Sequence, residues 1–462
     1  MVLLIGDVTE ADLKSSPVKH VTHLREVRGL ADGALVEFFG HVVRWDNRCA
    51  SEEQCLLWRS MADPSCDAAL DAMFKESSYI GKDLLESLEN HSDQRSAPDA
   101  ASAFLEEVSN IPPEDIRVDP RDVLIARDFF LDYSIQIMQA LFHYSLAGGF
   151  ASPRIVKTLR AVSYLMPPTR QDDGVEQESK AADDRTFARL LETTQFVLDV
   201  MGCVASSADA ESTGKSASDA PDSYLLPGGE GWKACIRVRM LHGIARRRVR
   251  QRLARESAGS YNEAYEGVPI SQEDMAATLA SFSTVPIWAL KRLHLRPAPA
   301  QVRAYLALWR HVGFYLGVAP SILRQYLHTP SAADQFLASA TLSLFSSNAP
   351  LDPRTLPTLP ILRAAAHRPP GGASLAHNCA VTRLLVGGAL ADHLGLPRTP
   401  PLARVRLYAA LAVQALPVLF ARCYPRAGWR AKRRAVMREG LPRSVRWSLD
   451  MLELAACQNT RE

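Results

Sequence analysis

Apolar residues recur along this chain with the spacing of helices. In the segment 231–256 one helix face is formed at steps of three and four by Ala234, Val238, Leu241, Ala245 and Val249. Comparable patterns predict further helices at about 52–89, 101–110, 151–166, 185–202, from 271 onward, and at 301–318, 378–395, 402–422 and 428–457. Residues 1–48 mix short β-branched runs with charges, so we expect an irregular or partly extended arm there.

Local signals place several helix ends. The segment 119–147 is apolar and aromatic on nearly all sides, which predicts one buried central helix that stops at Gly148 and Gly149. Pro153 falls in the first turn of the helix that follows. Ser271 can act as an N-cap, and Asp274 three residues later can complete a capping box. The small residues in the segment 301–318 predict a close approach of another element to that helix.

Changes in composition divide the chain into four parts. These are an N-terminal arm with helices (1–118), a main body (119–345), a proline-rich linker (346–377) and C-terminal helices (378–462). Within the body, the stretches 167–184 and 205–223 are polar and irregular. We expect both to be surface insertions, because they carry too few apolar residues to pack.

Composition excludes some classes of function. The 462 residues carry a net charge of only +2, which gives no general reason to expect a nucleic-acid partner. The eight cysteines form no CxxC pair and no finger-like spacing, so neither a zinc site nor a disulfide framework is indicated, and a reducing compartment is expected. The apolar run at the N-terminus is too short for a secretion signal. We therefore expect an intracellular protein.

One histidine has a suggestive setting. His242 lies beside the apolar face of the helix 231–256, with Arg239 three residues before it and Arg246 four residues after it. A neutral imidazole can bind haem iron, and flanking guanidinium groups can pair with the haem propionates. Two other interpretations remain open at this point. His242 can be an ordinary core histidine, or the eight arginines between 237 and 255 can form a basic helix for nucleic acid or anionic lipid.

Three runs of residues carry a family resemblance. They are VRMLHGIARRRV, GVPISQEDMAATLASFS and YLALWRHVGFYLGV, in that order. Together they resemble the latex clearing protein (rubber oxygenase) family, which also includes the endoplasmic-reticulum-bound oxygenase of mycophenolic acid biosynthesis. The resemblance covers about residues 119–320, roughly half of the chain.

The resemblance implies a fold, a cofactor and site residues. It implies an all-α protein whose globin-like core, 119–345, holds haem b, with additional N- and C-terminal helices around it. On this pattern His242 matches the proximal iron ligand, and the arginines that flank it match cofactor-binding residues. Arg189 and Thr193 match a distal Arg-x-x-Lys-Thr motif that contributes to catalysis. Glu192 stands where that motif has lysine.

The resemblance also implies a reaction. We expect a haem b-dependent oxygenase that cleaves a carbon–carbon double bond of a hydrophobic, isoprenoid-like substrate with dioxygen. An alternative is a haem-binding protein of the same fold without cleavage activity, because Glu192 replaces the motif lysine and 151–166 contains no acidic residue. A second alternative is a non-haem helical protein that uses the basic helix 237–255 for nucleic acid or anionic lipid.

A C-terminal segment raises the question of a membrane. The stretch 407–421 is apolar but shorter than the roughly 20 residues that a spanning helix needs. A run of basic residues follows it up to Arg438. Packing against the body is favoured, and peripheral contact with an anionic membrane, such as the endoplasmic reticulum, through 402–438 remains open.

Overall fold

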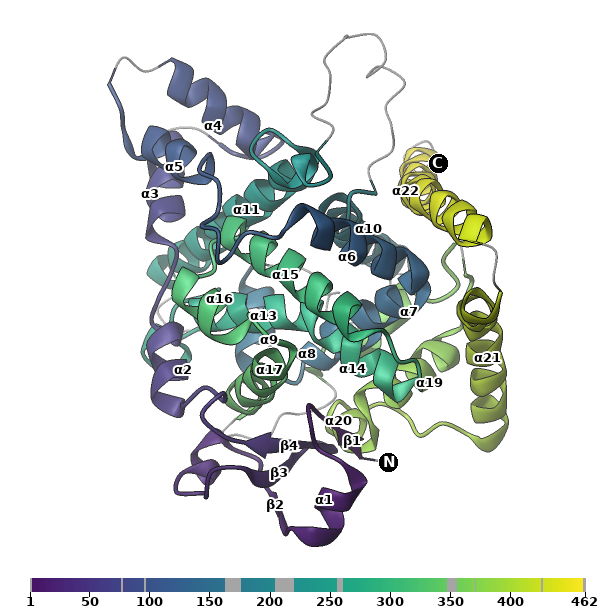
Figure 1. Cartoon of the computed structure of the whole chain (residues 1–462). Helices are drawn as coiled ribbons and strands as arrows, with labels where there is room; N and C mark the ends of the chain where they lie inside the picture. Colours follow the sequence, from purple (N-terminus) through teal and green to yellow (C-terminus); the bar gives the residue numbers. More distant parts are fainter. Residues whose placement is uncertain are drawn as a thin grey trace.

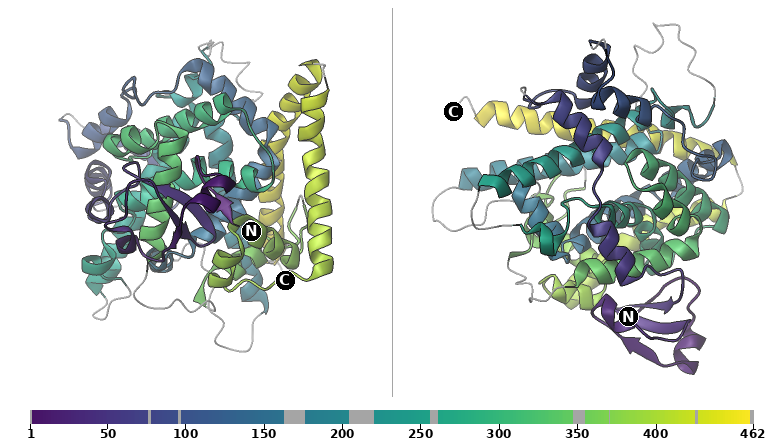
Figure 2. Two further views of the ribbon diagram at one scale, coloured as in Figure 1. Left: turned by 60° about the horizontal axis from the view of Figure 1, so that its bottom comes forward. Right: turned by 90° about the vertical axis from the view of Figure 1, so that its left-hand side faces the viewer.

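The fold was analysed in a computed structural model. It describes residues 2–75, 78–94, 97–162, 176–203, 220–255, 261–346, 355–369, 371–424 and 427–459. Helices form the body, and this confirms the predicted all-helical class. In Figure 1 a small purple N-terminal sheet lies at one end of the body, and two yellow-green C-terminal helices line one side. Figure 2 shows the sheet projecting from the body and the two C-terminal helices along one edge.

The N-terminal arm is more regular than predicted. Its elements are β1 (Leu3–Leu4), α1 (Glu10–Ser15), β2 (Val18–His20), the 3-10 helix η1 (Leu24–Val27), β3 (Ala34–Phe38) and β4 (His41–Trp45). The strands form one sheet in the order β1-β4-β3-β2, in which only the β3–β4 pair is antiparallel. Phe39 and Gly40, with φ of 45° and 81°, make the tight turn between those two strands. Val36 faces Val43 across that pair, and both are fully buried against the helical body.

Four helices lead from the sheet to the body. They are α2 (Glu52–Arg59), α3 (Pro64–Met73), α4 (Leu84–Asp93) and α5 (Ala100–Val108). The helical pattern predicted over 52–89 therefore forms three helices, with a break between each. Asp63, at the N-cap of α3, accepts a hydrogen bond from the Cys66 amide, and this cap marks the first break.

The central segment is not the single helix that the sequence predicts. It comprises α6 (Pro120–Asp132), α7 (Ser134–Gln139), the π-helix η2 (Ala140–Leu146) and α8 (Ala147–Gly149). Tyr133, with φ of −117° and ψ of 19°, leaves the helical region and interrupts the run. The apolar pattern concealed both the break and the π-turn, because a segment buried on all sides shows no periodicity. The predicted end at Gly148 and Gly149 is confirmed.

Most of the remaining helices follow the local signals. They are α9 (Pro153–Val162), α10 (Glu176–Val200), the 3-10 helix η4 (Ser223–Leu225), α11 (Glu230–Arg255), α12 (Glu263–Glu266), α13 (Gln272–Ser283), α14 (Val285–Arg292), α15 (Pro299–Tyr315), α16 (Pro320–Tyr326) and α17 (Pro330–Phe345). Pro153 begins α9, and the capping box of Ser271 and Asp274 is formed. A Cβ on Gly313 would lie 2.3 Å from Leu279 Cδ2, so the predicted close approach is confirmed.

The C-terminal part contains more helix than predicted. It comprises α18 (Thr358–Ala364), α19 (Leu375–Val386), α20 (Gly388–His393), α21 (Pro401–Cys423) and α22 (Ala427–Asn459). The segment predicted as a proline-rich linker contains α18, whose Ile361 and Leu362 are fully buried. Parts of the two predicted polar insertions, 167–175 and 205–219, lie outside the described residues, whereas 176–184 belongs to α10.

Candidate functional site

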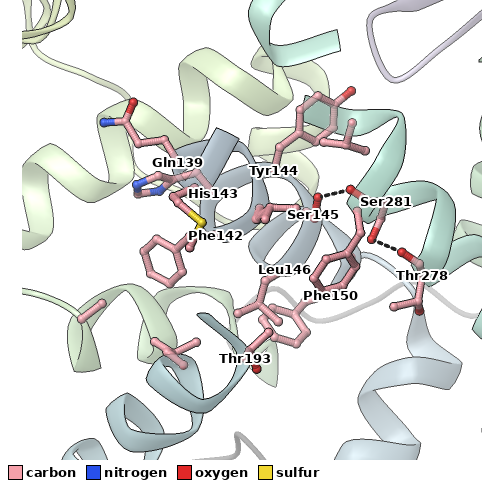
Figure 3. Close-up of a pocket in the computed structure, with 18 of the residues that line it drawn as sticks. Gln139, Phe142, His143, Tyr144, Ser145, Leu146, Phe150, Thr193, Thr278 and Ser281 are labelled. Atoms are coloured by element: carbon pink, nitrogen blue, oxygen red, sulfur yellow. Dashed lines mark hydrogen bonds between the residues drawn. The ribbon is translucent and has the colours of Figure 1, made fainter. Parts of the chain in front are cut away.

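A large apolar cavity of about 670 Å³ lies in the body. Its walls come from α7, η2, α9, α10, α13, α14 and α17, and parts of β3, α19 and α22 also line it. Figure 3 shows Phe142, Leu146 and Phe150 around this space, with Thr193 of α10 on another side. The elements that meet here span residues 38 to 441, so tertiary folding alone assembles the cavity.

The π-helix η2 forms the largest continuous part of the wall. All six residues from Leu141 to Leu146 line the cavity. A π-turn is rare and is found mostly at functional sites. The Ser145 hydroxyl donates a 2.6 Å hydrogen bond to the Ser281 carbonyl, which joins η2 to α13 (Figure 3). The segment that the sequence presented as a buried helix is thus a cavity wall.

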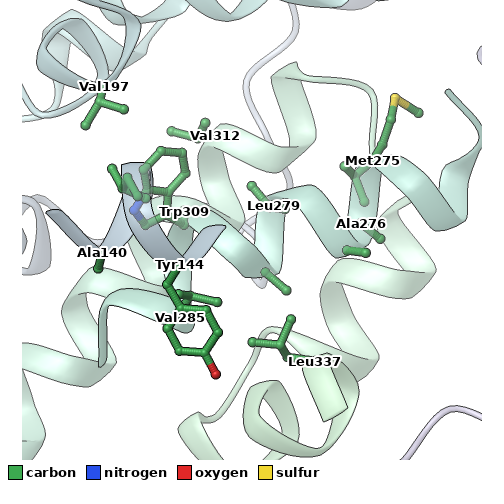
Figure 4. Packing of buried hydrophobic residues seen from close by; sticks show 14 of the residues in the cluster. Ala140, Tyr144, Val197, Met275, Ala276, Leu279, Val285, Trp309, Val312 and Leu337 are labelled. Carbon is green, nitrogen blue, oxygen red and sulfur yellow. The ribbon is translucent and has the colours of Figure 1, made fainter. Parts of the chain in front are cut away.

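The cavity wall is continuous with the main hydrophobic core. Tyr144, Val285 and Leu337 line the cavity and also belong to the core cluster. Figure 4 shows these side chains on one side of α13 and Leu279 near Trp309 and Val312 of α15. The shape of the cavity is therefore supported by close packing behind its wall.

Most hydroxyl and amide groups in the cavity already have partners. The hydroxyls of Thr193 and Thr194 donate to the carbonyls of Arg189 and Leu190, one turn earlier in α10. The Asn378 amide donates to the Leu362 carbonyl. Because these groups are satisfied within the protein, the cavity offers a mainly apolar surface, which suits a hydrophobic molecule.

Among the described residues, two histidines, His41 and His143, line the cavity. His41 is bound through Nε2 to the Tyr144 hydroxyl and through Nδ1 to the Phe39 carbonyl. His143, at the centre of η2, is bound through Nδ1 to the Thr382 hydroxyl at 2.8 Å. Burial lowers the pKa of each imidazole to about 3, so both are neutral near pH 7. Neither histidine has a charged or periodic neighbourhood in the sequence that distinguishes it from core residues.

The predicted iron ligand, His242, lies on α11 and is mostly buried. Burial lowers its pKa to about 4, and the charge of Arg246 adds to this shift, so the ring is neutral near pH 7. Its Nδ1 is buried without a hydrogen-bond partner among the described residues. His242 is not among the residues that line the cavity. A buried, unpaired ring nitrogen is unusual and is compatible with a missing ligand.

The two arginines that flank His242 are buried by ion pairs. Arg239 forms a bidentate pair with Asp63, with N–O distances of 2.7 and 2.9 Å, and also contacts Glu107. Arg246 is fully buried, and its Nε lies 2.8 Å from Asp67 Oδ1. Leu241, in contrast, is 54% exposed, so its predicted place on a buried apolar face is wrong. The buried side of α11 is rotated toward the acidic residues of α3, which the helix pattern could not reveal.

Other arginines of α11 are paired in the same way. Unlike the two buried pairs, these pairs lie at the surface. Arg237 contacts Asp83, Arg247 contacts Asp71, and Arg250 contacts both Asp67 and Glu263. A helix whose guanidinium groups are neutralised within the protein has less charge to offer to phosphate groups. The arrangement therefore gives little support to a nucleic-acid or lipid site on 237–255.

The three residues predicted on the distal side are separated by the structure. Thr193 lines the cavity. Arg189 and Glu192 pair with each other at 2.7 Å, and both side chains are 51% exposed. Thr193 is thus the predicted catalytic residue that lies at the cavity, whereas the exposed pair does not line it.

Comparisons with known proteins agree with this architecture. Residues 136–416 match the family described as the catalytic domain of the ER-bound oxygenases mpaB/B' and rubber oxygenase. A rubber oxygenase from Streptomyces sp. (strain K30) is 28% identical over 184 residues, which are 40% of this chain and 42% of that protein. The match thus spans less than half of that relative.

The fold has a solved counterpart. The structure of latex clearing protein LCP in the closed state is similar with a TM-score of 0.54 at 20% sequence identity, over 84% of this chain and 91% of that chain. The family match covers more than half of the sequence and includes η2, α10, α11 and α13, which carry the cavity wall and His242. The chain belongs to the family of ER-bound oxygenases mpaB/B' and rubber oxygenases.

Proposed function

We propose that this protein is a haem b-dependent oxygenase that cleaves a carbon–carbon double bond of a hydrophobic, isoprenoid-like substrate with dioxygen. The observation that carries the proposal is the 670 Å³ apolar cavity, which lies almost entirely within the segment matched by the oxygenase family. Alkenes offer no charge or strong hydrogen-bonding group for recognition. An apolar wall with satisfied polar groups therefore suits such a substrate.

His242 fits the binding of a haem better than the two arginines that flank it do. His242 is neutral and has an unpaired buried nitrogen, as a group that binds iron requires. It remains the predicted proximal ligand. Arg239 and Arg246, the predicted partners of the propionates, already pair with Asp63 and Asp67. They can serve a propionate only by sharing or exchanging those carboxylates.

The chain's own residues have simple roles in this proposal. When bound, haem supplies the redox chemistry of dioxygen. Leu146, Phe150 and Phe282 exclude water from the cavity and hold an alkene by apolar contact. Thr193, at the cavity wall, is placed to orient polar atoms there through its hydroxyl. Arg189 and Glu192 would need to turn inward to take part in catalysis.

The first test is an absorption spectrum of the purified protein, oxidised and reduced, with a pyridine haemochrome assay. We expect a Soret band and about one haem b per chain. The His242→Ala variant is expected to lose haem, whereas His294→Ala, on the loop after α14, is the matched control. Oxygen uptake with squalene or a farnesyl compound, followed by detection of carbonyl products, then tests cleavage. Absence of haem from the wild-type protein after reconstitution would refute the proposal.

A haem-binding protein without cleavage activity is the second candidate. It is supported by the cavity lining, which contains no carboxylate among the described residues, and by the outward position of Glu192. Such a site lacks a carboxylate base for proton transfer. The two candidates differ in one measurement. A haem-loaded protein that binds dioxygen reversibly and forms no carbonyl product from any alkene tested would favour the second candidate.

We also propose that α21 rests on a membrane surface. Within the described residues, Pro401–Ala421 is long and apolar enough to span a bilayer by length and composition, with a mean hydropathy of 1.4, yet only 11% of that window is buried. Its outer face exposes Leu402, Val405, Tyr408, Val413, Leu416, Leu419 and Phe420. Arg404 and Arg406 are exposed next to this face and suit anionic headgroups.

This contact is tested by co-sedimentation with vesicles of phosphatidylcholine alone or mixed with phosphatidylglycerol. We expect binding that is stronger to the anionic vesicles. Replacing Leu416 and Leu419 with Asp should abolish binding, because both side chains are about half exposed on α21. Ile80→Asp, at a still more exposed site (76%) far from α21 in the sequence, is the control. A dimer that persists without vesicles and dissociates in the double variant would instead assign this face to a second copy of the chain.

A further inference from the structure

A second cavity, of about 250 Å³, lies where the C-terminal helices meet the body. Its lining comes from Asp132 and Tyr133 at the junction of α6 and α7, from the loop before α15 and the start of α15, and from α21 and the start of α22. Figure 1 shows α21 and α22 along one side of the body. Among the described residues, this cavity shares no lining residue with the large apolar cavity. It is therefore a separate place at which a ligand could bind.

Positive charge dominates the lining of this second cavity. Three arginines line it, which are Arg296 in the loop before α15 and Arg430 and Arg433 in the first turns of α22. Asp132 is the carboxylate among the described lining residues. Because arginine keeps its charge in proteins, three positive charges face one negative charge.

That one carboxylate already serves another arginine. Arg434, which does not line the cavity, binds the two carboxylate oxygens of Asp132 at 2.8 and 2.5 Å. Nη1 of Arg433 lies 3.7 Å from Oδ1 of Asp132, which is too long for a hydrogen bond. The Arg433 guanidinium donates instead to the Asp132 main-chain carbonyl, at 3.2 and 3.3 Å. The charge of Arg433 is therefore poorly neutralised.

Electrostatics agree with this geometry. The side chain of Arg433 is only 15% exposed. Burial lowers the pKa of Arg433, Asp132 offsets this effect only in part, and the charge of Arg434 adds to the shift. A nearby anion would favour the charged form of Arg433 and stabilise this part of the fold.

Arg430 has no partner in the described part of the chain. No hydrogen bond or ion pair joins its guanidinium group to a described residue, and its Nε is buried without an acceptor. A buried donor that lacks an acceptor is unfavourable, and such groups are uncommon in folded proteins. The charge of Arg430 is thus left for a ligand to neutralise.

A phosphate group matches this lining. Guanidinium groups bind phosphate oxygens in pairs through their planar set of N–H donors. A phosphate monoester carries about 1.5–2 negative charges near pH 7, which suits the excess of positive charge. The volume of 250 Å³ leaves room for such a group, since one water needs only about 10–15 Å³ of such space.

We propose that this arginine-lined cavity binds a phosphate group through Arg430 and Arg433, with the exposed Arg296 at its outer side. The inference goes beyond the proposed oxygenase function and requires no haem. The group can belong to free phosphate or to the head of an anionic phospholipid such as phosphatidic acid. The second source is open because α21, the helix proposed to rest on a membrane, forms one wall of the cavity.

The test is isothermal titration calorimetry of the full chain in phosphate-free buffer, with inorganic phosphate as the probe. We expect the wild type to bind it, and Arg430→Gln and Arg433→Gln to bind about 10-fold to 100-fold more weakly, since each loses a charged hydrogen bond. Arg443→Gln is the matched control, because this arginine lies on the same helix with its side chain 73% exposed. Its affinity for phosphate should equal that of the wild type.

A second probe distinguishes the two sources of the phosphate group. Dihexanoyl phosphatidic acid is titrated below its micelle concentration into the same four proteins. Binding at least 10-fold tighter than that of inorganic phosphate, and weakened in the same two variants, would assign the site to a lipid head. Equal or weaker binding of the lipid would assign it to free phosphate.

Two results would overturn the proposal. One is a wild-type protein that binds neither probe, and the other is an affinity that Arg430→Gln and Arg433→Gln leave unchanged. Arg430→Gln keeps the test decisive if Arg433→Gln does not fold, because Arg430 has no partner in the described chain whose loss would destabilise it. Replacing Leu416 and Leu419 with Asp should not alter the affinity for inorganic phosphate. Failure of the membrane contact or of haem binding is therefore distinguishable from failure of this site.

Discussion

The ion pair between Arg239 and Asp63 allows a quantitative test of how α11 is held. Its side chains are only 7% and 4% exposed, and both guanidinium–carboxylate hydrogen bonds are short. Burial by itself would raise the pKa of Asp63, but the hydrogen bonds and charge of Arg239 outweigh burial and keep that pKa below its usual value. The ionised pair is therefore the stable form near pH 7. Asp63→Asn removes its negative charge and leaves the buried guanidinium with Glu107.

The expected loss follows from this geometry. Removing one partner of a buried ion pair typically costs about 3–5 kcal/mol, because the other charge remains in a poorly solvated place. Glu107 still contacts Arg239, but its side chain is 45% exposed and its charge is screened by water. We therefore expect Asp63→Asn to lower the free energy of unfolding by about 3 kcal/mol, at the lower end of that range.

Urea unfolding followed by far-ultraviolet circular dichroism measures this change. The control is Glu192→Gln, which breaks the exposed pair with Arg189 and should cost less than about 1 kcal/mol. A loss below about 1 kcal/mol for Asp63→Asn, equal to that of the control, would refute the reasoning. It would mean that the Arg239 guanidinium finds solvent or another partner without cost.

Three further results are expected. Gly243→Ala should destabilise the protein by about 1–3 kcal/mol in the same urea assay. The Cβ of the new alanine would lie 2.4 Å from Leu70 Cδ1 and push α11 away from α3. An unchanged unfolding midpoint would contradict this contact. The free energy of unfolding should fall as the pH is lowered from 6.5 toward 4, because each histidine that is neutral in the folded protein takes up a proton on unfolding. The expected slope is about 1.4 kcal/mol per pH unit for each such histidine. Burial lowers the pKa to about 3 or 4 in four of them, which are His41, His143, His242 and His311. His311→Asn should reduce this slope by one proton, and an unchanged slope would exclude His311. Thr278→Trp should fill part of the cavity and weaken binding of a hydrophobic alkene in a fluorescence titration without loss of haem; unchanged affinity would place the substrate elsewhere.

Part of the candidate site was accessible from the sequence. The three runs, one of them around His242, identified the family, and Thr193 lines the cavity while its distal role stays a prediction. The roles of His242, Arg189 and Glu192 remain predictions. The wall histidines were missed, because His143 has no neighbour in the sequence that signals Thr382, which is 239 residues away.

The local structure of this protein could be predicted from its sequence. The capping box of Ser271 and Asp274, the start of α9 at Pro153 and the end of α8 at Gly149 depend on residues within a few positions of each other. Helix periodicity and caps act over one or two turns, and such signals can be read directly from the chain. The helical class followed from them and from the family resemblance.

The surroundings of those elements depend on contacts between distant parts of the chain. Arg239 and Arg246 meet carboxylates that are 176 and 179 residues away, and those pairs bury charges that the helix pattern placed beside an apolar face. The cavity arises where β3, η2, α10, α13 and α17 meet around a π-turn. A cavity and a buried ion pair depend on which side chains face each other across separate elements, and this information is absent from the periodicity of any one helix.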